Sequence, residues 1–539
     1  MFFSVPVPKN EPVLTYQPGS PQRQQLQNTL QDLYNKHIEI PAIIGGKEVY
    51  GGATGSCICP HDHQHKLATY HKADEKEILC AIDAAVKAHK DWEDMPFYHR
   101  SAIFLKAAEL LSTKYRFLLN AATMLGQSKN AHQAEIDSSC ELIDFWRFNA
   151  YFAQKIYEQQ PLISPKGEWN FSSYRALEGF IFALTPFNFT AIAGNLPTAP
   201  ALMGNTVVWK PSGAAVYSGY YIMKILKEAG LPDGVINFIP GSGETIGQHV
   251  MHSPHLAGIH FTGSTKVFNH LWKTTANNIH LYKSYPRIVG ETGGKDFIFA
   301  HPSADVQALA VASLRGAFEY QGQKCSAASR LYIPQSIYDE WLSSMNEMLD
   351  QVKMGDVREF GNLINAVIDK ASFDNIKSYI DYSKNANDAS VIRGGNCDDS
   401  VGYFVEPTII KAENPLFKTM QEEIFGPVLT VYVYQDEDFE KTLELCDKTS
   451  VYGLTGSIFS QDRTAICTAY NALRHSAGNF YINDKPTGAV VGQQPFGGGR
   501  SSGTNDKAGS ALNLQRWISA RSIKENFVPA LNFDYPFMK

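Results

Sequence analysis

The sequence lacks the marks of several protein classes. Its eight cysteines are scattered over 539 residues, and no basic segment followed by an apolar stretch opens the chain, so neither a disulfide framework nor a signal peptide is expected. It has no low-complexity tract and no long basic run, and its net charge is −6, which argues against disorder and nucleic-acid binding. These absences favour a soluble protein of two or three domains in the cytoplasm, or in the mitochondrial matrix if it is a processed eukaryotic form.

Charge is missing altogether from residues 179–209. A membrane helix would need a continuous apolar stretch of this length. Prolines and asparagines interrupt this one at Pro186, Asn188, Asn195, Pro197, Pro200 and Asn205. Because proline breaks helices, the run is interpreted as the buried core of an α/β domain, and no membrane partner is expected.

One cluster has the residue types of a metal site. Its members are Cys57, Cys59, His61, His63 and His65. Alternate residues of a strand point to one face, so all five would align on a single strand. The spacing nevertheless differs from the paired C-x2-C or H-x3-H of zinc sites, and we expect a solvent-facing strand or hairpin edge without metal.

The patterning changes near residue 177, from helical stretches to short apolar runs that alternate with helices. Such alternation predicts a parallel, doubly wound α/β sheet. A second alternation begins at Asp296, so a domain boundary is predicted near Glu291, while residues 501–539 show only weak pattern. The predicted elements are a hairpin around Gly45–Gly46, strands at 179–184, 206–209, 235–239, 257–261 and 330–333, and helices at 21–37, 74–92, 97–114, 131–158, 191–203, 214–229, 244–252, 265–276, 304–320 and 336–351.

Three segments of the first alternation suit a dinucleotide. Phe261–Thr265 is a strand that ends in a small-residue turn and opens a helix, whose free N–H groups suit a pyrophosphate. Lys210 follows another strand and is a candidate for the adenosine ribose, although an ordinary surface lysine would look the same. Ile239–Gly247 nearly matches the dinucleotide fingerprint, but its third glycine is one position late.

Three residues offer complementary chemistry. Cys325 supplies a thiol that can add to an aldehyde carbonyl, giving a thiohemiacetal that expels hydride and leaves a thioester. The side chain of Asn188 and the N–H of Cys325 are candidate donors to the oxyanion, and Glu291 is the candidate base for thioester hydrolysis. Each residue alone fits a structural role, as a buried thiol, a cap or a surface acid.

Two later segments fit the same chemistry. Gln421–Pro427 offers Glu423 for a ribose diol and Phe425 to pack near a nicotinamide. Gln494–Gly499 offers Phe496 as an aromatic wall for the substrate. A turn with a core aromatic explains either segment equally well.

The segments Thr185–Thr190, Gly290–Lys295 and Gln321–Ala327 resemble the aldehyde dehydrogenase superfamily, with a likeness that runs from about residue 10 to the C-terminus. Further segments, among them Phe318–Ser326 and Gly492–Gly498, resemble its L-glutamate γ-semialdehyde dehydrogenase branch. The resemblance implies a Rossmann-type cofactor domain, an α/β catalytic domain and a small oligomerisation element in a homodimer. The implied segments are an N-terminal arm with the first part of the cofactor domain (1–150), an oligomerisation hairpin (151–176), the NAD-binding domain (177–290), the catalytic domain (291–500) and a C-terminal oligomerisation segment (501–539).

The same resemblance implies site roles. Cys325 is the nucleophile, Glu291 the base and Asn188 the oxyanion donor. The implied NAD contacts are Thr185, Lys210, Gly263, Ser264, Thr265, Lys266, Val267, Glu423 and Phe425. The implied substrate contacts are Ser326, Gly488 and Ala489 for the α-carboxylate, with Phe189 and Phe496 on either side of the aliphatic chain.

Two positions depart from the pattern. Some relatives have serine where Ala489 stands, so one hydroxyl contact is lost. Many have a glutamate, which discriminates against a 2′-phosphate, where Gly213 stands, so exclusion of NADP is not assured.

The resemblance implies NAD-dependent oxidation of L-glutamate γ-semialdehyde to L-glutamate, the second step of proline catabolism. The alternative enzymatic function is the oxidation of another small semialdehyde. A coenzyme A-acylating enzyme fits less well because Glu291 is present. A silent dinucleotide-binding scaffold is the non-enzymatic alternative, against which the intact Cys325, Glu291 and Asn188 argue.

Overall fold

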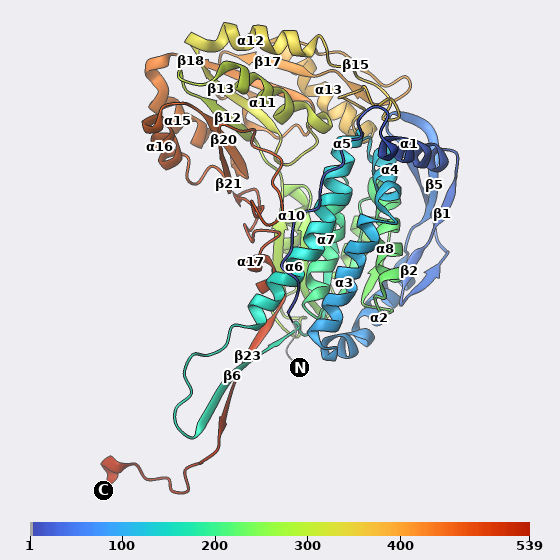
Figure 1. Cartoon of the computed structure of the whole chain (residues 1–539), viewed down its shortest axis with the longest axis vertical. Coiled ribbons are helices and arrows are strands. Elements are labelled where there is room, and N and C mark those ends of the chain that lie inside the picture. The colour runs from blue at the N-terminus through green and yellow to red at the C-terminus, as the bar shows by residue number, and fades with distance from the viewer. Residues whose placement is uncertain (1–3) are drawn as a thin grey trace.

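The computed structural model describes residues 4–539 and is built around two seven-stranded sheets with helices on their faces (Figure 1). The α/β class predicted from the alternating pattern is confirmed. Most predicted strands and helices are present to within a few residues of their expected ends. Within residues 4–539, no helix is long and apolar enough to cross a membrane.

The first sheet has the order β11-β10-β7-β8-β9-β2-β3. Its first five strands are parallel, and β2 and β3 add an antiparallel hairpin. The carboxyl ends of parallel strands share one edge, so Leu184, Lys210, Thr262 and Glu291 lie along the same edge of this sheet. The strands are β2 (Ala42–Ile44), β3 (Lys47–Val49), β7 (Phe180–Leu184), β8 (Thr206–Lys210), β9 (Ile236–Phe238), β10 (Leu256–Thr262) and β11 (Arg287–Glu291).

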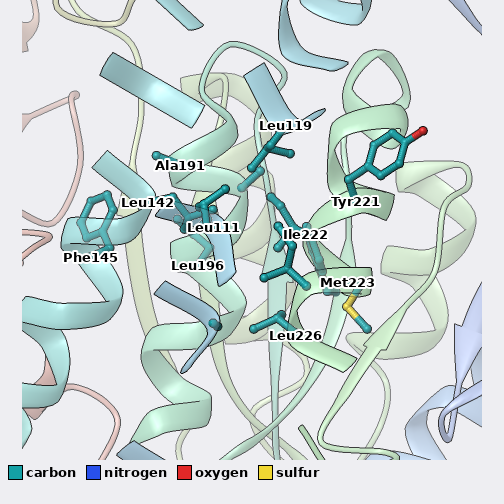
Figure 2. Close-up of a cluster of buried hydrophobic side chains, with 14 of the residues drawn as sticks. Leu111, Leu119, Leu142, Phe145, Ala191, Leu196, Tyr221, Ile222, Met223 and Leu226 are labelled. Atoms are coloured by element: carbon teal, nitrogen blue, oxygen red, sulfur yellow. The ribbon is translucent and has the colours of Figure 1, made fainter. Parts of the chain in front are cut away.

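Helices cover this sheet, and several stand side by side in Figure 1. Figure 2 shows their shared core, in which Leu111, Leu119, Leu142, Leu196 and Leu226 come from five different helices. The uncharged run of 179–209 forms β7, α7 and β8, and nearly all of it is buried, as its composition predicts. The helices of this half are α2 (Glu75–Asp94), α3 (Phe97–Ser112), α4 (Arg116–Gln127), α5 (Ala131–Ala134), α6 (Leu142–Tyr157), α7 (Thr190–Leu202), α8 (Val216–Ala229), α9 (Gly243–Val250) and α10 (Thr265–Asn277).

The second sheet has the order β14-β17-β18-β13-β12-β20-β21 and is parallel except for β14. Its strands are β12 (Asp296–Ala300), β13 (Ala328–Pro334), β14 (Ala389–Arg393), β17 (Thr408–Ala412), β18 (Val428–Tyr434), β20 (Thr455–Phe459) and β21 (Asn479–Ile482). The helices of this half are α11 (Val306–Phe318), α12 (Gln335–Leu349), α13 (Lys370–Lys384), α14 (Lys418–Gln421), α15 (Phe439–Thr449) and α16 (Arg463–Ala472), whereas the later α17 (Ala511–Gln515) packs on α6 of the first half. Because β12 follows β11 after only four residues, the chain passes from one sheet to the other at the end of β11.

A two-stranded sheet projects from the body of the molecule (Figure 1). It pairs β6 (Glu168–Arg175) with β23 (Ser519–Asn526), so the weakly patterned C-terminal segment forms a regular strand. The remaining elements are α1 (Pro21–Tyr34) and the short strands β1 (Ile38–Ile40), β4 (Thr54–Cys59), β5 (Asp62–His71), β15 (Cys397–Asp398), β16 (Phe404–Val405), β19 (Tyr452–Gly453) and β22 (Gly499–Arg500).

The cysteine and histidine cluster lies on a hairpin that turns between β4 and β5. The single strand on which all five residues would align is therefore wrong. So is the solvent-facing position for part of the cluster, because Cys57, Cys59 and His61 are buried. His65 stacks on Tyr34, and the Nε2 of His63 lies 2.8 Å from the carbonyl of Asp399.

The single helix predicted over 131–158 is interrupted. A π-helical segment, η1 (Glu135–Glu141), separates α5 from α6. Side chains of this segment bond to other parts of the chain, as in Asp137, whose carboxylate accepts the N–H groups of Thr190 (3.0 Å) and Ala191 (2.9 Å). Periodicity in the sequence carries no signal for such a segment, which is often found near functional sites.

Candidate active site

A cavity of about 1310 Å³ opens at the carboxyl edge of the first sheet. Its wall includes Leu184 and Lys210 at the ends of β7 and β8, and Thr262 at the end of β10. Cys325, from the second half of the chain, lines the same cavity. A cavity at the carboxyl ends of parallel strands is where a doubly wound sheet binds its ligand.

Ten of the predicted site residues line this cavity. They are Thr185, Asn188, Lys210, Gly263, Ser264, Lys266, Val267, Cys325, Glu423 and Phe425. Thr265 turns elsewhere, since its hydroxyl donates to the carbonyl of Ser501 at 3.4 Å. Glu291, Ser326, Gly488, Ala489, Phe189 and Phe496 lie outside the wall formed by the described residues.

The turn before Cys325 has an unusual backbone. Tyr320, Gln321 and Gly322 have consecutive φ angles of +52°, +54° and +64°, which is the left-handed region. Only glycine adopts this region freely, so the two preceding residues are strained. A Cβ on Gly322 would lie 2.2 Å from the carbonyl oxygen of Gly426, so no larger residue fits there. Such strain persists only where surrounding contacts fix the backbone.

Two buried glutamines supply those contacts. Gln321 donates to the carbonyls of Ser128 (3.1 Å) and Ala366 (2.8 Å) and accepts the N–H of Asn365 (3.0 Å). Gln323 accepts the N–H of Ile368 at 2.8 Å. Leaving any of these buried groups unpaired costs about 1–3 kcal/mol, so the glutamines hold the turn in place.

Asn188 is held beside the nucleophile turn. Its Nδ2 donates to the carbonyl of Gln323 at 3.1 Å, two residues before Cys325. It precedes α7, whose first N–H groups are held by Asp137. One amide hydrogen therefore orients the side chain, and the second is available in the cavity as an oxyanion donor.

Glu291 ends β11 on the other side of the site. Its Oε2 accepts the N–H of Gly498 at 3.3 Å, and a Cβ on Gly497 would lie 2.8 Å from its Oε1. Burial raises the pKa of this carboxyl well above its ordinary value, while the Gly498 N–H and the charge of Lys507 oppose that rise. A carboxyl of this kind is suited to act as a general base near neutral pH.

Cys325 is a buried residue, with 9% of its surface exposed. Burial raises its pKa well above the ordinary value, and the carboxyls of Asp296, Glu423 and Glu291 add to the rise. The sulfur is therefore protonated in this structure at neutral pH. A nucleophilic step must therefore transfer that proton to a base before the sulfur can attack.

Glu423 packs against the loop that follows Glu291. Its Oε1 accepts the N–H of Gly294 at 2.9 Å, and a Cβ on Gly293 would lie 2.3 Å from its Oε2. Burial raises its pKa to about 7. Next to it, the ring of Phe425 meets Phe187 edge-on at 5.8 Å, so an aromatic corner borders the carboxylate.

The start of α10 forms the opposite wall. Ser264 caps the helix by accepting the N–H of Val267 at 3.4 Å, and Gly263 and Lys266 line the cavity with it. A helix N-terminus with a neighbouring lysine attracts an anion. The hydroxyl of Thr185 is already held, since it accepts the indole N–H of Trp209 at 2.9 Å.

The predicted carboxylate-binding residues meet one another directly. The hydroxyls of Ser326 and Thr487 are 2.7 Å apart, and both side chains are buried. Gly488 has φ +96°, a conformation that turns the backbone of the loop. Ser326 is thereby joined to the loop that contains Gly488 and Ala489.

Sequence reasoning missed a buried cation beneath Phe189. Lys129 pairs with Asp137 at 2.7 Å, and its ammonium lies 4.1 Å from the ring centre of Phe189 and 4.4 Å from that of Tyr320. The group links the Asn188 segment to the nucleophile turn. The sequence around Lys129 contains no motif, charge run or turn signal. Its role is therefore visible only from its contacts in the structure.

The fold and the site can now be compared with known proteins. The model of the aldehyde dehydrogenase family matches residues 50–523. The chain belongs to the aldehyde dehydrogenase family.

Similar members of the family cover nearly the whole chain. A Dictyostelium discoideum protein named mitochondrial delta-1-pyrroline-5-carboxylate dehydrogenase is 56% identical over 99% of this chain and 96% of its own length. The human protein of the same name is 49% identical over 98% of this chain and 94% of its own.

Solved structures of aldehyde dehydrogenases agree in shape. The delta-pyrroline-5-carboxylate dehydrogenase of Mycobacterium tuberculosis bound with NAD superposes with a TM-score of 0.97 at 51% identity, covering 100% of this chain and 99% of that one. The 1-pyrroline-5-carboxylate dehydrogenase from Thermus with bound NAD gives 0.92 at 33% identity, covering 97% and 100%.

Proposed function

We propose that the protein oxidises L-glutamate γ-semialdehyde, the open form of Δ1-pyrroline-5-carboxylate, to L-glutamate with NAD, as the second step of proline catabolism. The observation that carries the proposal is that Cys325 and Asn188 line a cavity suited to a dinucleotide, while the carboxyl of Glu291 lies outside the wall but close enough to Cys325 to raise the pKa of its thiol. Relatives and solved structures named for this activity, two of them bound to NAD, support it over nearly the full length of the chain.

The residues of the cavity fit NAD. The N-terminus of α10, with Gly263, Ser264 and Lys266, suits the pyrophosphate. Lys210 is assigned to the adenosine ribose, and Glu423 to the other ribose beside the aromatic corner of Phe425. When bound, NAD supplies the hydride acceptor.

Cys325 begins the chemistry. Its thiol gives up the proton to a neighbouring carboxylate, and the sulfur bonds to the aldehyde carbon, forming a thiohemiacetal. The oxyanion takes hydrogen bonds from Asn188 Nδ2 and the N–H of Cys325, and it returns its electron pair to the carbon as hydride leaves. Glu291 then removes a proton from water, and the resulting hydroxide adds to the thioester carbon. The carbon–sulfur bond breaks to release the carboxylic acid, and the proton held by Glu291 passes to the Cys325 sulfur.

The substrate is recognised at the end distant from the aldehyde. Ser326 and the backbone N–H groups of the loop with Gly488 and Ala489 are proposed to hold its α-carboxylate. Backbone N–H groups hold a carboxylate without a charged side chain. Phe189 and Phe496 are proposed to flank the aliphatic chain.

The projecting sheet of β6 and β23 supports the proposal of a homodimer. Apolar side chains are exposed on it, on the segment that leads into β6 and on the tail beyond β23, at Leu162, Trp169, Phe527, Leu531, Phe533 and Phe537. Light scattering on the eluting protein is expected to give twice the mass of the chain, and the mass of one chain would contradict the dimer. We also keep as proposals the segment boundaries after residues 150, 176, 290 and 500.

The compartment is proposed as the cytoplasm, or the mitochondrial matrix for a processed eukaryotic form. The names of the human and Dictyostelium relatives favour the second. Imaging of the tagged protein in its own cells distinguishes the two.

The test of the function is NADH production with L-glutamate γ-semialdehyde, succinate semialdehyde, acetaldehyde and a larger aldehyde. A preference in kcat/KM for the first supports the carboxylate contacts of Ser326. A preference for succinate semialdehyde would leave the proposed mechanism intact but would contradict the proposed substrate. With the thiol shown to be reduced, no turnover of any aldehyde would favour a silent scaffold.

A further inference from the structure

The part of the cavity at the end of β8 carries two charged side chains that the mechanism does not use in chemistry. Lys210 ends β8, and Glu244 lies in the first turn of α9. Both line the cavity, together with Ser212. A Cβ on Gly243 would lie 3.9 Å from the Nζ of Lys210, so the start of α9 lies against the lysine.

Within residues 4–539, neither the ammonium of Lys210 nor the carboxylate of Glu244 forms an ion pair or a side-chain hydrogen bond, and Lys210 is half-buried while Glu244 is exposed. Burial lowers the pKa of Lys210, so its ammonium has lost part of its hydration without gaining a partner. A half-buried cation without a protein partner, next to the helix start that carries an exposed carboxylate on the same cavity wall, is arranged for a ligand with both acceptors and donors.

The sheet order fixes which part of a dinucleotide reaches this end. Glu291 ends β11 and Lys210 ends β8, with β10 and β7 between them. Three strand spacings separate the two residues, about 14 Å along the edge. The α10 N-terminus follows β10 and lies on the Glu291 side of β7. A dinucleotide whose pyrophosphate is at α10 and whose nicotinamide is near Cys325 therefore directs its adenosine toward Lys210 and α9.

Glu244 is the acid of this end. Of the described residues that line the cavity, two are acidic, and the other, Glu423, lies beside Gly294 near the nucleophile. Gly213 brings no carboxylate, and a Cβ there would meet only the hydroxyl of Tyr70, at 3.4 Å. Discrimination between a ribose diol and a ribose phosphate, if the chain has it, must come from another residue than 213.

We propose that Glu244 determines cofactor choice, by accepting a hydrogen bond from the adenosine ribose hydroxyls and repelling a 2′-phosphate. The inference rests on the proposed function, because it takes NAD as the cofactor. A carboxylate close to a phosphate dianion is unfavourable, which is how a binding site rejects a competing ligand. When the charge of Glu244 is removed, Lys210 still attracts the 2′-phosphate. The affinity for NADP should therefore rise by more than the affinity for NAD falls.

The test is calorimetric titration of the full-length protein with NAD and with NADP, in the absence of aldehyde. Glu244→Gln removes the charge at nearly constant shape, and Glu340→Gln removes the same charge from the exposed face of α12, distant in the fold from β8 and α9. We expect the ratio Kd(NADP)/Kd(NAD) to fall roughly tenfold in Glu244→Gln and to stay constant in Glu340→Gln.

An unchanged ratio in Glu244→Gln, with NAD still bound by the parent, would overturn the inference and leave the proposed function intact. A parent protein that binds neither dinucleotide would overturn both. An equal fall in both variants would mean that net charge, and not the position of Glu244, sets the ratio, and would also overturn the inference.

Discussion

The two walls of the active-site cavity are held in different ways. The nucleophile wall, formed by residues 319–327 and Asn188, is almost wholly buried, and Gln321 alone makes three hydrogen bonds to other segments. The dinucleotide wall is formed by Lys210, Glu244 and the start of α10, and the charged groups of Lys210 and Glu244 have no ion pair or hydrogen bond among the described residues.

The difference separates two tasks. The reacting groups must be in place to a fraction of an ångström before the aldehyde arrives, so the fold fixes them in advance at the cost of a strained turn. The charged groups of Lys210 and Glu244 find their hydrogen-bond and charge partners on the dinucleotide. They therefore have no partners within the described part of the protein. Variants on the nucleophile wall should therefore change turnover, and variants on the dinucleotide wall should change affinity.

The largest expected effect is at Cys325. Cys325→Ala removes the atom that bonds to the substrate, and we expect turnover to fall at least about 10⁴-fold. Because the residue belongs to the nucleophile wall, the Kd of NAD should change little. Steady-state kinetics and calorimetry measure the two quantities, with Cys467→Ala, at an exposed cysteine, as the control. Full turnover in Cys325→Ala would refute the assignment of Cys325 as the nucleophile.

Asn188 comes next. Asn188→Ala removes one oxyanion donor, and kcat should fall about 10²–10³-fold with little change in the affinity for NAD. Asn28→Ala, at an exposed site of α1, is the matched control. If kcat were unchanged while KM rose, Asn188 would bind the ground state and would not stabilise the transition state.

The pH dependence tests the base. Glu291 acts as a carboxylate, so the rate of thioester hydrolysis should fall as pH drops through its pKa, by up to tenfold per pH unit below it. Because burial raises that pKa, the fall should begin well above the ordinary range of a glutamate. Single-turnover release of product at several pH values measures this. A rate that is flat down to the ordinary glutamate range would contradict the assignment, as would the same pH profile in Glu291→Gln.

The smallest effect on turnover, and the sharpest comparison of the two walls, comes from two glutamines. Gln321→Ala leaves three buried backbone groups unpaired and should lower the free energy of unfolding by about 3 kcal/mol or more, with a reduced kcat. Gln248→Ala, at an exposed position that lines the cavity, should cost less than about 0.5 kcal/mol. Denaturant unfolding measures both. Equal losses of unfolding free energy in the two variants would mean that the two walls are fixed equally strongly, and would contradict the comparison.

The sequence predicts the dinucleotide wall better than the nucleophile wall. Strand ends and helix starts are local signals, so Lys210, Gly263 and Ser264 follow from β–α alternation, and all three line the cavity. Cys325, Asn188 and Glu291 were found through resemblance and chemistry, because their meeting depends on contacts across more than a hundred residues.

Other features lack any local signal. The left-handed turn at Tyr320 and Gln321, the π-helix at Glu135–Glu141 and the buried Lys129 are fixed by distant partners. The same holds for β23. It forms a strand by pairing with β6, which lies more than 300 residues earlier in the sequence.

The measurement that tests the account most directly is mass spectrometry of the Glu291→Gln variant, mixed with NAD and L-glutamate γ-semialdehyde and quenched in acid. With nucleophile and oxyanion donors intact but the hydrolytic base removed, a glutamyl thioester should accumulate on the peptide that contains Cys325. It should be absent without NAD and in the Cys325→Ala variant. An adduct on another cysteine, or none while calorimetry shows NAD bound, would contradict the account.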